Sequence, residues 1–227
     1  MPATSRKAPP VEHVPELTTN RLSVYLRCLD ALDTAGQRTV SSRALADRCL
    51  VNAAQVRKDL AYFGEFGVRG VGYTVADLRG HLRQILGLDR RRRMVIVGAG
   101  NLGMALADYA GFRDQGFDTV ALLDTARHKV GTRSRTGIEV HHASELAEVV
   151  AREDVSVGVV AVPAAAAQET VEALVAVGVR AILDFAPPPV RTPPGVKVKH
   201  VDLAVSLESL SFFLAAEHHE QTPAPQP

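Results

Sequence analysis

The stretch Met94-Val95-Ile96-Val97-Gly98-Ala99-Gly100-Asn101-Leu102-Gly103 decides the fold of the second half of this chain. Four apolar residues predict a buried strand, and the glycine-rich loop after them predicts a tight turn into a helix. Gly98 permits the turn, Gly100 lets the backbone approach a pyrophosphate, and Gly103 lets helix and strand pack closely. Because the amide groups at the start of such a helix face the phosphates, all six loop residues are predicted to bind a dinucleotide.

The next predicted strand, residues 119–123, ends in Asp124, twenty-one residues after Gly103. A carboxylate at this position accepts hydrogen bonds from an adenosine ribose and repels the 2′-phosphate of NADP. We therefore expect NADH and NAD+ as the ligands. The segments Val162-Pro163 and Phe185-Ala186-Pro187 follow later predicted strands, and ligands of parallel sheets bind at such carboxyl ends.

Alternating strands and helices predict an α/β domain with a doubly wound, Rossmann-like parallel sheet over residues 94–201. The remaining strands are expected at residues 138–140, 155–162, 180–185 and 196–201, and the helices between them at 144–152 and 164–177. A last helix, 202–219, carries an apolar side formed by Leu203, Leu207, Leu210, Phe213 and Leu214. Core packing would explain this side. Since no strand follows, exchange of the helix with a partner subunit is the alternative explanation.

Charge is distributed unevenly along the chain. Residues 1–93 carry 16 Lys/Arg against 9 Asp/Glu, whereas residues 94–227 carry 10 against 16. The basic half indicates a polyanionic partner. The chain shows neither a transmembrane run nor a secretory leader, so no membrane partner and a cytoplasmic location are expected.

Residues 18–88 predict a winged helix-turn-helix domain at the basic end of the chain. Leucines recur at helical spacing from Leu22 to Leu32, and Ser41-Ser42 can cap a short second helix. Asn52 and Gln55 stand at the spacing of a capping box at the start of a third helix, which is expected to run to residue 63. The four glycines in residues 64–74 permit a two-stranded wing before a fourth helix.

The third helix is predicted to enter the major groove of DNA. At helical spacing its apolar side chains pack on one side, and the opposite face with the wing supplies the residues expected to contact DNA: Gln55, Arg57, Lys58, Tyr62 and Arg69. A solvated basic face is the alternative interpretation. The basic segment 89–93 is expected to be a solvated linker, which adds at most a non-specific, salt-sensitive affinity for DNA.

The two cysteines, Cys28 and Cys49, lie in apolar helical patterns and are expected in the core. Two cysteines support neither a disulfide framework nor a zinc site, so no metal is expected. Residues 1–17 and 220–227 are rich in proline and poor in periodic apolar residues, and are predicted to be disordered tails.

The combination of motifs resembles the Rex family of redox-sensing transcriptional repressors over nearly the whole ordered chain. The matching segments are residues 55–64, 67–73, 98–103 with 107–112, and 185–187. The resemblance implies a homodimer with swapped C-terminal helices that binds a palindromic operator ahead of respiratory and fermentative genes. It also implies that NADH releases the dimer from DNA, while NAD+ competes without the same effect.

The resemblance further implies a switch of hydrogen bonds and charge between subunits, formed by Arg27, Tyr109 and Asp202. Tyr109 and Asp202 are also expected to contact the cofactor. Each residue also has a purely structural explanation. Arg27 could be a solvated helix residue, Tyr109 an aromatic that packs against a helix, and Asp202 a helix N-cap. Two positions depart from the family. Asp184 stands where asparagine is frequent, and Leu203 where some members have an aromatic residue, so the redox set point is expected to differ.

Two other classes of protein remain open. An NAD-dependent dehydrogenase would need a substrate domain and an acid-base pair. About 134 residues follow the linker, and Arg113 stands where a lysine would partner Tyr109. A DNA-binding regulator that senses another nucleotide, such as a coenzyme A derivative, fits the same domain order, although Asp124 argues against it.

Overall fold

The computed structural model describes residues 14–220 except 69 and 188, and the chain divides into two compact units between Arg90 and Arg91. Arg69, expected to contact DNA, lies outside the described residues, as do most of both expected tails. Residues 16–17, expected in the N-terminal tail, are helical instead, with an acidic Glu16 in the first turn of their helix. An acidic side chain there is favourable to the helix dipole.

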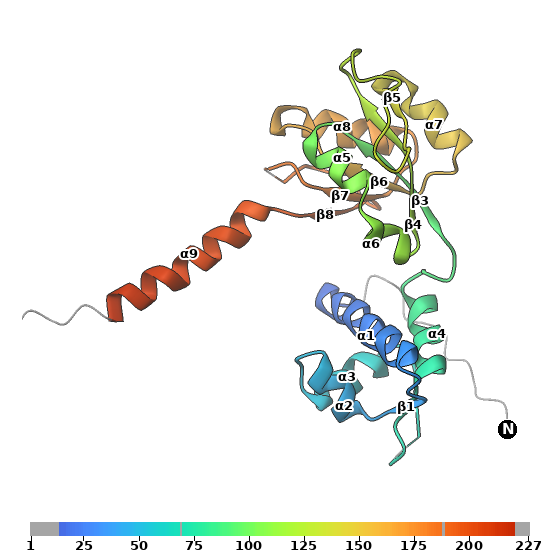
Figure 1. Ribbon diagram of the computed structural model, residues 1–227, viewed down its shortest axis with the longest axis vertical. Helices are drawn as coiled ribbons and strands as arrows, with labels where there is room; N and C mark the ends of the chain where they lie inside the picture. The colour runs from blue at the N-terminus through green and yellow to red at the C-terminus, as the bar shows by residue number, and fades with distance from the viewer. Residues whose placement is uncertain (1–13, 69, 188, 221–227) are drawn as a thin grey trace, which may run out of the picture. The chain divides into compact units, whose positions relative to one another are not determined.

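The first unit combines four helices with a two-stranded antiparallel sheet (Figure 1). Its elements are α1 (Glu16–Thr34), β1 (Thr39–Val40), α2 (Ser42–Arg48), α3 (Ala53–Ala61), β2 (Tyr73–Thr74) and α4 (Val75–Ile85). Apolar side chains of all four helices form one core, which includes the fully buried Leu22, Leu45, Val56 and Leu82. This arrangement confirms the expected DNA-binding fold.

Local hydrogen bonds hold the start of α2 and the turn between α2 and α3. Ser41 Oγ accepts from the amide of Ala44, and Asn52 Oδ1 accepts from the amide of Gln55 over 2.7 Å, as the cap patterns predicted. Between the two helices, Leu50 adopts a left-handed backbone with φ 55°, and the amide of Val51 donates to the carbonyl of Ala46. This is the Schellman ending of a helix.

Two expectations for this unit were wrong in detail. Helix α3 ends at Ala61, not at residue 63. Among the described residues of the wing, only Val68 and Gly72 form an antiparallel bridge, while β2 pairs with β1 across the unit. Several glycines of the wing have positive φ, so the backbone changes direction repeatedly. Few consecutive residues therefore remain extended and able to pair as strands.

The second unit contains a six-stranded parallel sheet in the order β5-β4-β3-β6-β7-β8 (Figure 1). The strands are β3 (Arg92–Val97), β4 (Phe117–Asp124), β5 (Val140–His142), β6 (Val157–Val160), β7 (Ala181–Asp184) and β8 (Lys197–His200). The order reverses beside β3, as in a Rossmann sheet, and confirms the predicted fold class.

Helices cover both faces of this sheet. They are α5 (Asn101–Ala107), α6 (Ala110–Asp114), the 3-10 helix η2 (Ala143–Glu145), α7 (Leu146–Arg152) and α8 (Ala164–Ala176). A last helix, α9 (Leu203–Glu220), follows β8 and leaves its large apolar side chains exposed. Side chains of α7 and α8 share one core with β3 and β6, and those of α5 and α6 share another with the opposite face. None of the helices among the described residues is both long enough and apolar enough to cross a membrane.

Several boundaries differ from the sequence predictions, and two of the differences change the assignment of a segment. Arg92 and Arg93, expected in the linker 89–93, belong to β3, because the amide of Arg92 pairs with the carbonyl of Gly116. The segment 138–140, expected as a strand, contributes only its last residue to β5. The preceding residues instead turn back, with an isolated bridge between Arg133 and Glu139.

Candidate functional site

A cavity of about 710 Å³ opens at the carboxyl ends of β3, β4 and β6, where the strand order reverses. The residues predicted at these strand ends line it: Gly98, Gly100, Asp124, Val162 and Pro163. Its walls are mostly apolar, with a few polar groups among them, and this composition is typical of a small-molecule site. The placement is where Rossmann sheets bind nucleotides.

The three glycines fit the roles that a dinucleotide requires. Gly98 has φ +106°, and a Cβ there would lie 2.4 Å from the carbonyl oxygen of Ala161. A Cβ on Gly103 would lie 1.8 Å from the carbonyl oxygen of Gly98, so only glycine allows α5 this close. A Cβ on Gly100 would meet no atom within 4 Å, which leaves open space at the start of α5 for a phosphate.

Asp124 already has three hydrogen-bond donors within the chain. Its Oδ2 accepts from the amide of Ala99 over 2.9 Å and from Lys129 Nζ over 2.8 Å, and its Oδ1 accepts from the amide of Ala126. Burial alone raises the pKa of this carboxyl, but the bonds from Lys129 and the two amides outweigh it and hold the pKa below its ordinary value. The carboxylate therefore orders the glycine loop and remains charged.

Lys129 changes the expected discrimination against a 2′-phosphate, because its ammonium group neutralises Asp124. We predict that Asp124→Ala leaves this cation unpaired and shifts the NADPH/NADH affinity ratio upward by at least about tenfold, since charge-assisted bonds contribute about 1.5–3 kcal/mol. Lys129→Ala is the matched variant and should lower the same ratio. Isothermal titration with both nucleotides measures the ratios, and an unchanged ratio in Asp124→Ala would contradict this role for the carboxylate.

Other predicted cofactor residues lie in different surroundings. Asn101 and Leu102 are exposed at the start of α5, whereas Ala99 is buried beneath the loop. Phe185 packs partly buried against the core on the α5 side of the sheet. Among the described residues the cavity lining includes neither Tyr109 nor Asp202.

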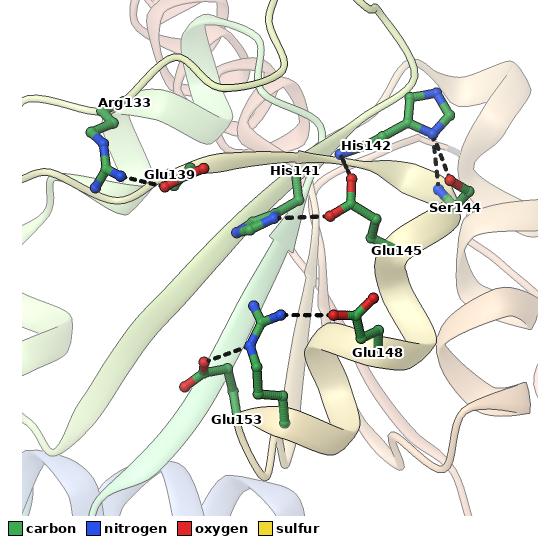
Figure 2. A network of polar contacts seen from close by, with 9 residues as sticks. Arg133, Glu139, His141, His142, Ser144, Glu145, Glu148 and Glu153 are labelled. Atoms are coloured by element: carbon green, nitrogen blue, oxygen red, sulfur yellow. Dashed lines mark hydrogen bonds and ion pairs between the residues drawn. The ribbon is translucent and has the colours of Figure 1, made fainter.

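A polar network beside the cavity was missed at the sequence level (Figure 2). His142 lines the cavity and caps η2, with Nδ1 accepting from the amide of Ser144. Glu145 returns the contact by accepting from the amide of His142 over 3.0 Å, and its second oxygen faces His141 Nδ1 at 3.2 Å. The bond from the His142 amide is the main reason why the pKa of Glu145 is lowered. A histidine in the position of a helix cap gives little signal in a single sequence.

Asp108 fixes the turn that follows α5. Its carboxylate accepts from the amides of Arg135 and Thr136 and from the Thr136 hydroxyl. Burial raises the pKa of Asp108, but these bonds outweigh it and leave the pKa well below its ordinary value. The helix expected to contain Tyr109 therefore ends before it. Tyr109 instead occupies the N-cap position of α6, and its ring lies 5.1 Å from that of Phe112, edge to face.

The three predicted switch residues fall in both units. Arg27 is exposed on α1 in the first unit, and Tyr109 is 59% exposed in the second. Asp202 caps α9, with Oδ1 accepting from the amides of Ala204 and Val205. Asp184 is fully buried, accepts from the amide of Ala186 and lies 3.4 Å from His200 Nδ1. Its carboxylate is thus engaged within the sheet.

The exposed side of α3 carries the predicted DNA-contacting residues, with one correction. Lys58 and Tyr62 are exposed, and Arg57 Nη1 donates to Ser42 Oγ across the turn. Gln55 is partly buried, and its amide donates to Asp59 Oδ1 instead of closing the capping box. The reason is the buried Asp59, which lies one helical turn after Gln55 and gathers side-chain donors around its carboxylate.

Lys58 offers a direct test of the DNA surface. We predict that Lys58→Ala lowers the slope of log affinity against log salt by about 1 if the side chain meets a phosphate. A base contact would instead relax sequence preference at one operator position. Fluorescence anisotropy at several salt concentrations on operator and scrambled DNA distinguishes these outcomes, and wild-type values in both assays would contradict a DNA contact. Arg43, an exposed cation on α2, is the matched control.

A winged helix-turn-helix unit joined to a Rossmann unit with a nucleotide cavity defines a DNA-binding regulator that responds to a nucleotide. Family models match both units: one described as "Putative DNA-binding protein N-terminus" over residues 13–61, and a "CoA binding domain" over residues 89–188. A redox-sensing transcriptional repressor Rex from Syntrophomonas wolfei is 50% identical over 202 residues, which is 89% of this chain and 96% of the relative. The chain belongs to the Rex family.

Further relatives agree along the length of the chain. The Rex repressor of Streptomyces coelicolor is 46% identical over 211 residues, covering 93% of this chain and 79% of its own. A crystal structure of RSP with β-NAD+ and operator DNA is 35% identical, with a TM-score of 0.86 over 92% of this chain and 95% of its own. RSP with β-NADH is 33% identical, with a TM-score of 0.80 over 92% and 98%.

Proposed function

We propose that this protein is a redox-sensing repressor that binds operator DNA as a homodimer and is released when NADH binds. The observation that carries the proposal is the dinucleotide cavity, with its glycine-rich loop, in the same chain as a winged helix-turn-helix unit. The similarity to RSP supports it, because RSP has been crystallised with β-NAD+ together with operator DNA, and separately with β-NADH.

Helix α9 supports the homodimer. Its large apolar side chains are all more than half exposed within this chain: Leu203, Val205, Leu207, Leu210, Phe212, Phe213 and Leu214. A soluble chain rarely leaves so large an apolar surface in water, so a partner must cover it. A second copy that exchanges α9 is the occupant that the family suggests, and a palindromic operator would match its twofold symmetry.

Gly111→Ala tests the switch by moving the ring of Tyr109 without removing its hydroxyl group. That ring lies over Gly111, where a Cβ would approach Tyr109 Cε1 to 2.5 Å, so Gly111→Ala must displace the ring. We predict that this variant and Tyr109→Phe both require about tenfold more NADH for DNA release, while operator affinity without ligand changes less than about twofold. Asp202→Ala should act in the same direction. Equal loss of both properties in each variant would contradict a switch role for these residues.

Fluorescence anisotropy of a labelled palindrome from upstream of the protein's own gene tests the function directly. The protein is titrated onto the DNA at fixed salt, and NADH, NAD+ or coenzyme A is then added. Release by NADH that excess NAD+ reverses is the expected result. Binding that responds to neither dinucleotide would overturn the redox proposal.

Coenzyme A deserves its own arm in this experiment, because the family model over residues 89–188 carries that name. Release by coenzyme A but not by NADH would establish a DNA-binding regulator that senses a coenzyme A derivative.

We propose no enzymatic activity, and steady oxidation of NADH in the presence of a metabolite would contradict this. As a repressor acts where the chromosome lies, the proposed location is the cytoplasm.

A further inference from the structure

The two cysteines of the chain meet in the first unit. Cys28 lies on α1, and Cys49 is the C-cap residue of α2, 21 positions later in the chain. Cys49 Sγ donates to Cys28 Sγ over 2.8 Å, and both side chains are partly buried against the core of the unit. The sequence contains two cysteines in all, so each thiol has the other as its nearest possible partner for oxidation.

We propose that Cys28 and Cys49 form an intramolecular disulfide when the protein meets a peroxide. The nucleotide cavity takes no part in this reaction. The protein would therefore respond to redox conditions in two ways, through the nucleotide in the second unit and through a disulfide in the first. A disulfide requires the sulfurs to close to about 2.05 Å, a movement of less than about 1 Å from their present separation. Small side-chain rotations at the end of α2 and on the side of α1 achieve this without moving either helix far.

The reaction consumes one peroxide and two thiols and yields one disulfide and two waters. Cys28 attacks a peroxide oxygen, forms a sulfenic acid and releases the first water. Cys49 then attacks the Cys28 sulfur and expels the hydroxyl group, which leaves as the second water with the thiol proton. Burial, followed by the hydrogen bond to Cys28, raises the pKa of Cys49 to about 12. Cys49 therefore stays protonated at neutral pH and carries the proton that leaves with the second water.

The bond would tie α1 to the turn that precedes the recognition helix α3. Cys49 comes directly before Leu50, the residue with left-handed backbone, and three residues before Asn52, which caps α3. Because the sulfurs are already in contact, the folded unit changes little. The unfolded chain, in contrast, loses the freedom of the loop between the two cysteines. Oxidation should therefore stabilise this unit in a form that still binds DNA.

The test uses the full-length protein treated with hydrogen peroxide, with the excess then removed. Expected results are the loss of both titratable thiols, a linked Cys28–Cys49 peptide in the digest, and single chains on a non-reducing gel. Three of the four tyrosines, Tyr25, Tyr62 and Tyr73, lie in the first unit, so tyrosine fluorescence follows its unfolding. The midpoint should rise by on the order of 10 °C, and dithiothreitol should reverse the rise.

Cys28→Ser and Cys49→Ser are the matched controls, and peroxide should raise the midpoint of neither. The reduced wild-type protein serves as the reference if either variant folds poorly. Disulfides between chains, sulfinic acid as the main product, or thiols that survive peroxide would each overturn the proposal. An internal disulfide that leaves the midpoint unchanged, or that weakens operator affinity by more than about twofold, would overturn the stabilising role.

Discussion

Gly103→Ala is expected to abolish the response to NADH while operator binding remains. The new Cβ would lie 1.8 Å from the carbonyl oxygen of Gly98, so α5 must move away from β3 and the glycine loop must open. Overpacking of this kind costs up to about 3 kcal/mol, and if the nucleotide must restore the closed loop against that cost, NADH affinity falls by about a hundredfold. The DNA-binding helices belong to the other unit and keep their own core.

Gly100→Ala separates damage to the fold from damage to the ligand site. Its Cβ would meet no atom within 4 Å, so the melting temperature should stay at the wild-type value. The methyl group nevertheless occupies the space where a phosphate approaches, and NADH affinity should fall about tenfold, the equivalent of about 1.4 kcal/mol. Titration calorimetry and thermal unfolding measure the two quantities. NADH affinity at the wild-type level in both variants would contradict the assignment of the loop to the nucleotide.

Asp59→Ala should cause the largest loss of stability in the DNA-binding unit. The carboxylate is fully buried and accepts from Arg21 Nε over 2.6 Å and from the Tyr25 hydroxyl over 2.8 Å, in addition to Gln55. Removing it leaves Arg21, which is only 27% exposed, without a counter-ion. A broken buried pair costs about 3–5 kcal/mol, and partial exposure of the arginine places the expected loss near the lower end.

The pH dependence of this loss identifies the carboxylate as its cause. Burial alone raises the pKa of Asp59, but the bonds from Arg21, Tyr25 and Gln55 outweigh it, so the pKa in the folded protein is below its ordinary value. The stabilisation is therefore complete above about pH 4, near the unfolded pKa, and is lost as pH falls through the folded pKa. The wild-type and variant proteins should converge in strong acid.

Urea denaturation followed by circular dichroism, repeated from pH 7 down to about pH 3, measures this difference. Asp47→Ala on α2 is the control, since Asp47 is exposed and a surface change of this kind stays within about 0.5 kcal/mol. A difference between wild type and Asp59→Ala that does not vary with pH would show that lost packing, and not the charge, causes the effect.

Local patterns predicted much of this molecule, and long-range contacts account for what they missed. The glycine loop, the caps at Ser41 and Asn52, and the alternation of strands and helices depend on neighbours in sequence, where periodicity and turn chemistry are informative. Asp59 looked like any polar residue on an amphipathic helix. Its partner Arg21 is 38 positions away, and no pattern in a single sequence reports that distance.

At the nucleotide site, too, some residues could be predicted from the sequence and others could not. Asp124 was predicted because it ends a strand after a glycine loop. Lys129 was missed, although it follows five residues later, because a lysine in a loop is usually solvated. Asp108 was missed because its partners, the amides of Arg135 and Thr136, are 27 and 28 positions away. These two residues explain why the charge at the ribose site and the end of α5 differ from expectation.

The bond between the Ala99 amide and Asp124 also bears on how fast the protein can respond. A loop that is held in place by its own carboxylate loses little conformational entropy when a nucleotide arrives. One dinucleotide can therefore replace the other without a folding step in the loop. The rate of this exchange is then limited by the dissociation of the bound nucleotide. The protein would then follow a change in metabolism as quickly as its ligand departs.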